Sequence, residues 1–273
     1  MTRVLTRTAL PLAVLFFVLL AMAGCRGGEE TDLTAGEISD NQLPLMLLSL
    51  EDFGPDFRDY ELEEDSGPRT AADMADDDFD PEDEALDIER FGWASGYERS
   101  YLNGDAARTR SGIFASSSDV NLFDTADGAA GYLDDLMVEL EALPGKTSGG
   151  FTLAEARQFD ADAADEAAGF YFSGSVQADD GSQVPLFSTG IILRRGRLLG
   201  SVGFVSFDRL EAEEQLKGLA LMLDQRIIDV LKEEAQGEQG SEPLVMRPGA
   251  VLITSGERFT QQVETSGGRS TPL

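Results

Sequence analysis

The order of strands and helices is the feature that most constrains how this chain folds. Two β-rich groups occur, and each closes with a strand, an aspartate and a long helix whose apolar residues recur at steps of three and four. Aspartate is a favoured N-cap residue, so Asp124 and Asp208 suit the starts of these helices. In the first group the closing strand is predicted over 120–123 and the helix over 125–143. In the second group the strand is predicted over 198–207 and the helix over 209–232.

The remaining β-rich segments complete an antiparallel sheet. They carry aromatic and β-branched residues, and turn signals such as Asp179-Asp180-Gly181 and Arg195-Gly196 separate them. They are predicted over 91–102, 111–116, 170–176 and 186–193. Strands that meander and are then followed by helices indicate an α+β fold. We expect an antiparallel sheet covered on one face by the two long helices, and the repeated order also suggests two similar halves.

The apolar stripes of the two helices predict which side chains face the sheet. Leu136 and Leu223 lie at the centres of these stripes, so both are expected to be buried. Glu139 and Asp224 are expected on or near the polar faces.

The first 25 residues have the layout of an export signal. Arg3 and Arg7 form a positive start, an apolar run follows, and small residues lead to Cys25, which is the single cysteine of the chain. The apolar run is shorter than the roughly 20 residues that a membrane-spanning helix needs. The alternatives are an uncleaved anchor and an ordinary secretory signal with an incidental cysteine.

The end of this signal resembles the lipobox of bacterial lipoproteins. Ala23-Gly24-Cys25 fits the family pattern, and Met22 occupies a place where leucine is more usual. The resemblance implies that residues 1–24 are a removable signal peptide and that the thiol of Cys25 carries a lipid. The lipid would hold the protein at a cell membrane, on its extracytoplasmic side.

Composition excludes several classes of function. The chain has 51 acidic and 21 basic residues, a net charge of −30, so a nucleic-acid partner is not expected. It has no histidine, which excludes Ser-His-Asp and Cys-His catalytic sites and the commonest zinc ligand. With Cys25 lipidated, no disulfide or thiolate metal site remains. We therefore predict no cofactor, no metal site and no catalytic residues.

The domain organisation follows from shifts in composition. Residues 25–40 are polar and glycine-rich and predict a flexible tether. A folded domain is predicted over 41–234, with an acidic loop at about 56–89. Residues 235–273 predict a polar linker and C-terminal tail, with a strand over 245–254 as an option.

Two charged motifs are candidate ion sites. Asp76, Asp78 and Asp80 alternate as in a calcium loop, but Pro81 replaces the turn glycine and Asp87 replaces the closing glutamate. Either this segment binds divalent ions loosely or it is a solvated acidic loop.

The second motif is the only basic cluster after the signal. Arg194, Arg195 and Arg197 are candidates for contact with a carboxylate or phosphate anion. The alternative is that they pair with acidic groups of the chain itself.

Aromatic residues on adjacent predicted strands are candidates for an apolar pocket between sheet and helices. Ordinary core packing is the alternative. These residues are Phe170, Phe172, Phe187, Phe204 and Phe207.

The arrangement over 43–232 is similar to extracytoplasmic lipoprotein domains with a PsbP-like fold and to the outer sensor domains of mycobacterial kinases. The similarity rests on the apolar entry at 43–53, the helix start at 124–129, the hairpin at 191–197 and the helix at 219–227. It implies binding or sensing at the cell surface without catalysis.

These observations predict a lipid-anchored extracytoplasmic protein that acts by binding or interaction. Its partners would be the membrane, through the lipid on Cys25, and a protein or small apolar ligand. The alternative is a solute- or lipid-binding lipoprotein with an apolar pocket, and a carboxylate-based hydrolase is third. A cavity under the helices would favour the binding protein with an apolar pocket. An exposed apolar patch would favour a protein partner. A cleft with two carboxylates of raised pKa would favour an enzyme.

Overall fold

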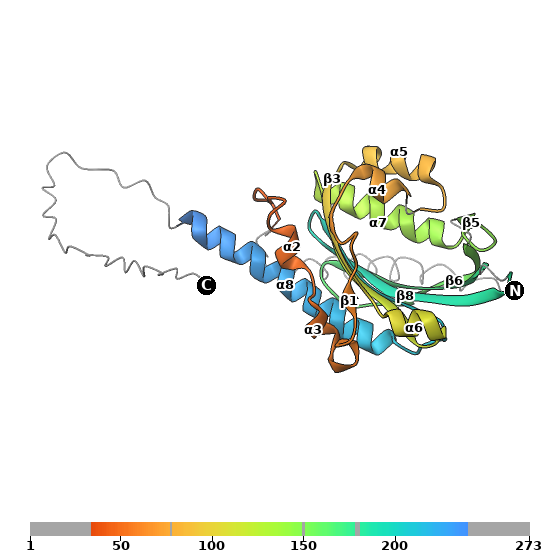
Figure 1. Cartoon of the computed structure of the whole chain (residues 1–273). Coiled ribbons are helices and arrows are strands. Elements are labelled where there is room, and N and C mark those ends of the chain that lie inside the picture. Colours follow the sequence, from red (N-terminus) through yellow and green to blue (C-terminus); the bar gives the residue numbers. More distant parts are fainter. Residues whose placement is uncertain (1–33, 77, 149–150, 178–180, 240–273) are drawn as a thin grey trace, which may run out of the picture.

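A computed structural model describes residues 34–76, 78–148, 151–177 and 181–239 (Figure 1). The signal peptide, Cys25 and the optional strand over 245–254 lie outside the described residues. Among the residues that are described, no helix is long and apolar enough to cross a membrane.

One antiparallel sheet forms the centre of the molecule. Every neighbouring pair of strands in it is antiparallel, which confirms the α+β class and the antiparallel sheet. From edge to edge the strands are β1 (Glu61–Leu62), β3 (Trp93–Leu102), β4 (Ile113–Phe123), β9 (Leu198–Ser206), β8 (Gln183–Arg195), β7 (Glu166–Gln177), β6 (Phe151–Asp160) and β5 (Thr147–Ser148), and β2 (Gly67–Arg69) also pairs with β3.

The two long helices lie on opposite faces of the sheet, so the prediction that both cover one face is wrong (Figure 1). The helix α7 (Ala126–Leu140) packs on one face, where Leu199 joins a core with Leu133. The helix α8 (Glu213–Gln239) packs on the other, where Leu198 joins a core with Leu223. Leu198 and Leu199 are adjacent on β9 and therefore point to opposite faces of the sheet. Consecutive apolar residues are typical of strands that are buried on both faces.

Shorter helices complete both layers. With α7 lie α4 (Ala71–Asp76) and α5 (Pro81–Phe91), as Figure 1 shows. With α8 lies α2 (Leu43–Met46), and α3 (Leu50–Phe53), a 3-10 helix (Pro55–Phe57) and α6 (Gly104–Thr109) connect the other elements. The two similar halves are not found, because the helices after the neighbouring strands β4 and β9 lie on opposite faces.

The buried and exposed positions predicted for α7 and α8 agree with the structure, with two exceptions. Leu223 is fully buried, and a Cβ atom placed on Gly200 would lie 3.1 Å from its Cδ2 atom, so helix and strand pack closely. Leu136 of α7 is only partly buried, because it lines a cavity. Asp224 is also buried rather than on the polar face, since its carboxylate pairs with Arg195 at 2.7 Å, whereas Glu139 is exposed as expected.

Three other local predictions differ from the structure. The segments predicted over 111–116 and 120–123 form the single strand β4, which begins at Ile113, because the intervening serines pair in the sheet although they break the apolar pattern. Thr125, not Asp124, caps α7, since its Oγ1 atom accepts a hydrogen bond from the Gly128 backbone nitrogen at 2.9 Å. Asp208 caps no helix, and it accepts a hydrogen bond from the Gly112 backbone nitrogen instead.

The folded domain extends beyond the predicted limits of 41 and 234. Thr34 and Ile38, which lie in the predicted tether, are buried, and α8 continues to Gln239. The acidic segment at 56–89 is not a loop, because most of it forms β1, β2, α4 and α5. Ala75 and Ile88 give the two helices enough buried apolar surface to pack despite the high density of acidic groups.

Candidate functional site

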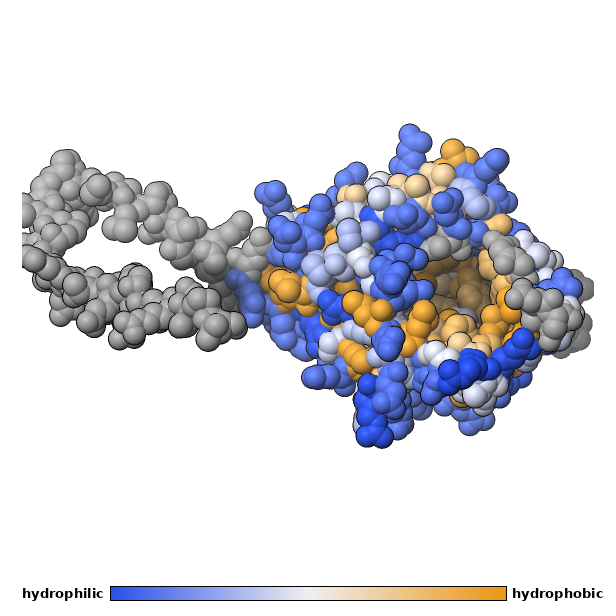
Figure 2. All heavy atoms as spheres, viewed as in Figure 1, coloured by the Kyte–Doolittle hydropathy of each residue, from blue (hydrophilic) through white to orange (hydrophobic). Residues whose placement is uncertain are grey.

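An acidic cavity of about 310 Å³ lies between the sheet and the helices on the α7 side. Figure 2 shows that the molecule is hollowed between its upper helices and the strands below them. The residues lining the acidic cavity are Arg69, Met74, Asp78, Glu84, Glu98, Asp119, Asn121, Tyr132, Leu136, Ile192, Leu199, Gly200 and Ser201.

Strand register places the polar groups of the cavity floor in one row. Glu98 of β3 is opposite Asp119 of β4, and Asp119 is opposite Ser201 of β9. Side chains that are directly opposite on neighbouring strands share one face of the sheet. A polar row therefore crosses the middle of the sheet, where apolar residues are usual.

Asp119 is held by its neighbours in this row. Its carboxylate accepts hydrogen bonds from the Ser201 hydroxyl and, at 3.0 Å, from the Asn121 side-chain nitrogen. The Asn121 side-chain oxygen in turn accepts a hydrogen bond from the indole nitrogen of Trp93 at 3.0 Å. Burial raises the pKa of Asp119 to about 6, although the hydrogen bond from Ser201 favours the ionised form.

Glu84 reaches the cavity from the helix above the sheet. It lies on α5 with 7% of its surface exposed, and its Oε1 atom accepts a hydrogen bond from the Tyr132 hydroxyl of α7 at 2.6 Å. Burial raises the pKa of Glu84 to about 7, and the nearby charges of Asp78, Asp87 and Glu139 act in the same direction. Burial and the charge of Glu84 also raise the pKa of Tyr132 far above its ordinary value, so its hydroxyl remains a donor.

One guanidinium group stands at the edge of the cavity. Arg69 forms an ion pair with Glu98 and donates a hydrogen bond to the Asp73 carbonyl oxygen at 2.8 Å. A second depression of about 430 Å³ lies beside Arg69 and is lined mainly by acidic and small polar residues. Burial, followed by the charges of Glu98 and Asp65, raises the pKa of Glu63 in that depression.

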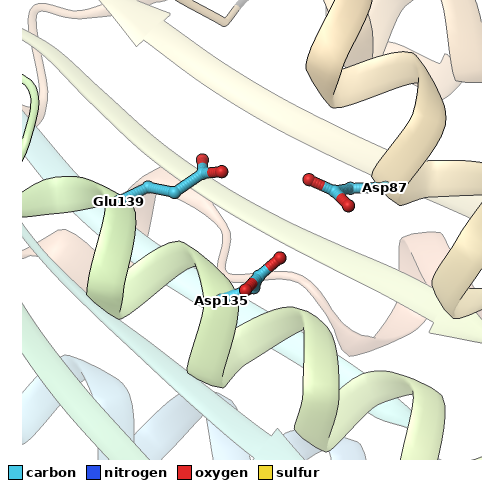
Figure 3. A group of neighbouring side chains, drawn as sticks. All are labelled: Asp87, Asp135 and Glu139. Carbon is cyan, nitrogen blue, oxygen red and sulfur yellow. The ribbon is translucent and has the colours of Figure 1, made fainter.

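A separate acidic cluster joins α5 to α7. Figure 3 shows Asp135 and Glu139 on α7 and Asp87 facing them from α5, and one carboxylate oxygen from each lies within 4.8 Å of the others. Arg90 already supplies positive charge here, because its Nη1 atom lies 3.4 Å from Asp87 and 3.3 Å from Asp135. A divalent cation would have to compete with this guanidinium group.

The predicted calcium-like motif does not converge on a point. Asp76 ends α4, and Asp78 accepts a hydrogen bond from the Asp80 backbone nitrogen at 2.7 Å, which forms a local turn before α5. Of the three, only Asp78 lines the acidic cavity.

The arginine cluster has partners within the chain, as the alternative interpretation expects. Arg194 lies 3.1 Å from Glu166, and Arg195 pairs with Asp165 and Asp224 at 2.8 and 2.7 Å. An external anion would have to displace these carboxylates.

Arg197 holds the chain segment that enters the domain. Its side chain donates hydrogen bonds to the carbonyl oxygens of Thr34 and Gly36 at 2.9 and 2.8 Å. The turn between β8 and β9 thus receives residues 34–36.

The five phenylalanines do not line one pocket, because they lie on both faces of the sheet. Phe204 is buried on the α8 side and stacks on Phe57 with ring centroids 5.4 Å apart. Phe170 and Phe172 pack beside the end of α7, on the opposite face. The remaining two contact other aromatic rings, Phe187 with Tyr171 and Phe207 with Phe114.

Sequence reasoning missed the carboxylates of the cavity. With 51 acidic residues in the chain, Glu84, Glu98 and Asp119 have no distinguishing motif. One signal was present, since Asp119 lies in a β-rich segment where the face that packs against helices is normally apolar.

The solved structures that resemble this chain do so at low sequence identity. No protein-family model and no curated protein matches the chain. Among solved structures, the extracellular domain of PknH from Mycobacterium tuberculosis is similar with a TM-score of 0.44 and 10% identity, over 72% of this chain and 98% of that chain. A protein of unknown function from Pseudomonas aeruginosa, PA94, a putative regulator, is similar with a TM-score of 0.24 and 16% identity, over 57% and 87%. Both similarities are too low to assign a function.

Proposed function

We propose that this chain is a lipid-anchored, extracytoplasmic binding protein without catalytic activity, and that the acidic cavity is its ligand site. The observation that carries the proposal is a cavity in which carboxylates are already held in place by the hydrogen bonds of their neighbours. Such preorganised polar groups in a concave, partly apolar site are typical of small-molecule binding.

The charge of the cavity favours a cationic ligand. Four carboxylate residues line it, against the single guanidinium group of Arg69. The hydroxyl of Tyr132 and the side-chain nitrogen of Asn121 donate to carboxylates of the chain itself, so a ligand would meet mainly hydrogen-bond acceptors. An ammonium group supplies both the positive charge and the donors.

The apolar part of the lining favours an organic cation over a bare metal ion. Met74, Leu136, Ile192 and Leu199 line the same cavity. Calcium and magnesium prefer a shell of oxygen ligands, and these side chains offer none. A small amine with an apolar body matches both parts of the lining.

The resemblance of the first 25 residues to a lipoprotein signal supports anchoring at a membrane. Cys25 after Ala23-Gly24 matches the lipobox, and a lipid there would place the domain on the extracytoplasmic side. The acidic surface would repel anionic lipid headgroups, so membrane attachment would depend on the lipid.

Binding of a short primary amine tests the proposal. Trp93 is the only tryptophan of the chain and contacts Asn121 of the cavity, so its fluorescence should report butylamine binding. The amine stays protonated below about pH 10, whereas the carboxylates gain charge between about pH 5 and pH 8. We therefore expect affinity to rise with pH over this range.

Matched variants locate the site. Asp119→Asn should weaken binding at least about tenfold, by removal of one charge from a buried site. Asp134→Asn is the control, because Asp134 is an exposed acid on α7 outside the cavity lining. Equal affinity of both variants and wild type would overturn the assignment of the cavity as the ligand site.

A carboxylate-based hydrolase is the second candidate. It is favoured by the raised pKa values of Glu84, about 7, and Asp119, about 6, in one cleft, since a proton donor near neutral pH is what acid catalysis needs. The test is turnover of a panel of aryl glycosides by wild type and by Glu84→Gln. Hydrolysis that is lost in the variant would replace the binding proposal with an enzyme.

A further inference from the structure

Three successive rows of side chains cross the α7-facing side of the sheet and change steadily in character. The first is the polar row of Glu98, Asp119 and Ser201. The second consists of small residues, Ser100, Ser117, Gly203 and Gly190, paired across four strands. The third is mostly apolar and contains Leu102, Ala115, Val205, Ser188 and Phe172, paired across five strands.

The second and third rows continue the polar row of the cavity floor along the same face of the sheet. Ser201 lines the cavity, and Gly203 and Val205 are the next residues of β9 on the same face. All five side chains of the third row remain partly exposed. Figure 2 shows a hollow with apolar lining between the upper helices and the strands. We call the surface of the second and third rows the apolar trough.

We propose that the acidic cavity and the apolar trough together bind one amphiphile, a primary amine that carries a single alkyl chain. The ammonium group lies near Glu98 and Asp119, and the alkyl chain extends over the small residues toward Val205. This inference rests on the proposed function, because the acidic cavity supplies the head-group site.

The dimensions of the sheet suit such a ligand. At a rise of about 3.3 Å per residue, Ser201 and Val205 are roughly 13 Å apart along the strand, which matches an octyl or decyl chain. On β4 and β9 the small residues of the second row leave the path open, since a Cβ atom on Gly203 would have no neighbour closer than 3.4 Å. On β8 the Phe170 ring covers Gly190 and bounds the path.

Charge complementarity selects this occupant over other amphiphiles. A fatty acid or alkyl sulfate would place its anionic head beside the carboxylate of Asp119, and it would have to displace Glu98 from Arg69 to reach a positive charge. A neutral alcohol would gain the apolar contacts without the ionic ones. The amine alone matches both the acidic and the apolar end.

A series of alkylamines tests the inference. The protein of residues 26–273 retains every residue of the described cores, and Trp93 fluorescence again reports binding. Butylamine, hexylamine, octylamine and decylamine are compared with octanol and octyl sulfate at concentrations below micelle formation. We expect affinity to rise by up to about fourfold for each added methylene group, the gain for full burial of that group. Octanol and octyl sulfate should bind at least about tenfold more weakly than octylamine.

Two variants separate the head-group site from the chain site. Ala115→Phe fills the trough floor without touching the acidic cavity, so it should flatten the dependence on chain length while butylamine still binds. Leu86→Ala is its control, because Leu86 is an exposed residue of α5 outside both surfaces. Circular dichroism and urea midpoints confirm that each variant folds.

The outcomes distinguish the two proposals. If butylamine binds but affinity does not depend on chain length, the acidic cavity remains the ligand site and the inference that the trough binds an alkyl chain is overturned. If octanol or octyl sulfate binds as tightly as octylamine, the amine assignment is overturned. If no amine binds at any length, the proposed function fails together with the inference.

Discussion

Glu84→Gln gives a direct test of how α5 is packed over the cavity. The carboxyl group of Glu84 is buried, and its pKa is raised from 4.5 to about 7. Its folded pKa therefore lies above its unfolded pKa. Below about pH 4.5 the group is protonated in both states and does not affect stability.

As pH rises above about 4.5, burial of the ionised Glu84 carboxylate lowers the stability of the folded state. Each pH unit between the unfolded and folded pKa values removes about 1.4 kcal/mol of folding free energy. The wild-type protein should therefore lose up to about 3 kcal/mol between about pH 4.5 and pH 7 because of this one group. The glutamine side chain cannot ionise and can still accept the hydrogen bond from Tyr132. The variant should lack this part of the pH dependence.

Urea denaturation at about pH 5 and pH 8 measures the effect, since urea carries no charge and does not screen the interaction. The free energy of unfolding of Glu84→Gln minus that of wild type should increase by about 2–3 kcal/mol from the lower to the higher pH. Glu82→Gln, the same substitution at an exposed position of α5, should give a difference that does not change with pH. A constant difference for Glu84→Gln as well would refute the burial of this carboxyl group.

Further predictions concern the core, the buried ion pair and the anchor. Leu223→Ala should lower the free energy of unfolding by about 2–5 kcal/mol, and Leu136→Ala by clearly less, because Leu136 already borders a cavity; urea titration compares them. Asp224→Asn should destabilise the domain by about 1–3 kcal/mol, since it removes the charge of one of the two carboxylates that pair with the Arg195 guanidinium group, whereas Glu139→Gln should change stability by no more than about 0.5 kcal/mol. Similar, small losses for both acids would contradict the buried position of Asp224. Cys25→Ser should release the protein from membranes in cell fractionation, and a variant that stays membrane-bound at wild-type size would place the anchor elsewhere.

Local patterns predicted the elements of this fold better than their arrangement. The apolar stripe that includes Leu216, Leu223 and Ile227 specifies the buried face of α8 without reference to the rest of the chain. The choice of sheet face for each helix depends on which strands are neighbours. That information is weak in the sequence, although the adjacent Leu198 and Leu199 indicated burial on both faces.

The candidate site depends on contacts between distant parts of the chain. Asp119 and Ser201 are 82 residues apart and meet only because β9 pairs with β4. The register of this strand pair places both side chains on the face that lines the cavity. A shift of one residue would turn one of them to the opposite face. Glu84 could not be identified from the sequence either, because its segment was expected to be a solvated loop. Only the packing of α5 against α7 buries its carboxyl group.

If the chain is lipid-anchored as proposed, the hydrogen bonds from Arg197 to Thr34 and Gly36 also limit how the domain is oriented at the membrane. With a lipid on Cys25, as proposed, the eight residues 26–33 separate the lipidated cysteine from Thr34. At about 3.5 Å per extended residue, that length reaches no more than about 30 Å. The end of the sheet with the β8–β9 turn would therefore stay near the membrane, and the opposite end, with β5 and α6, would face outward (Figure 1).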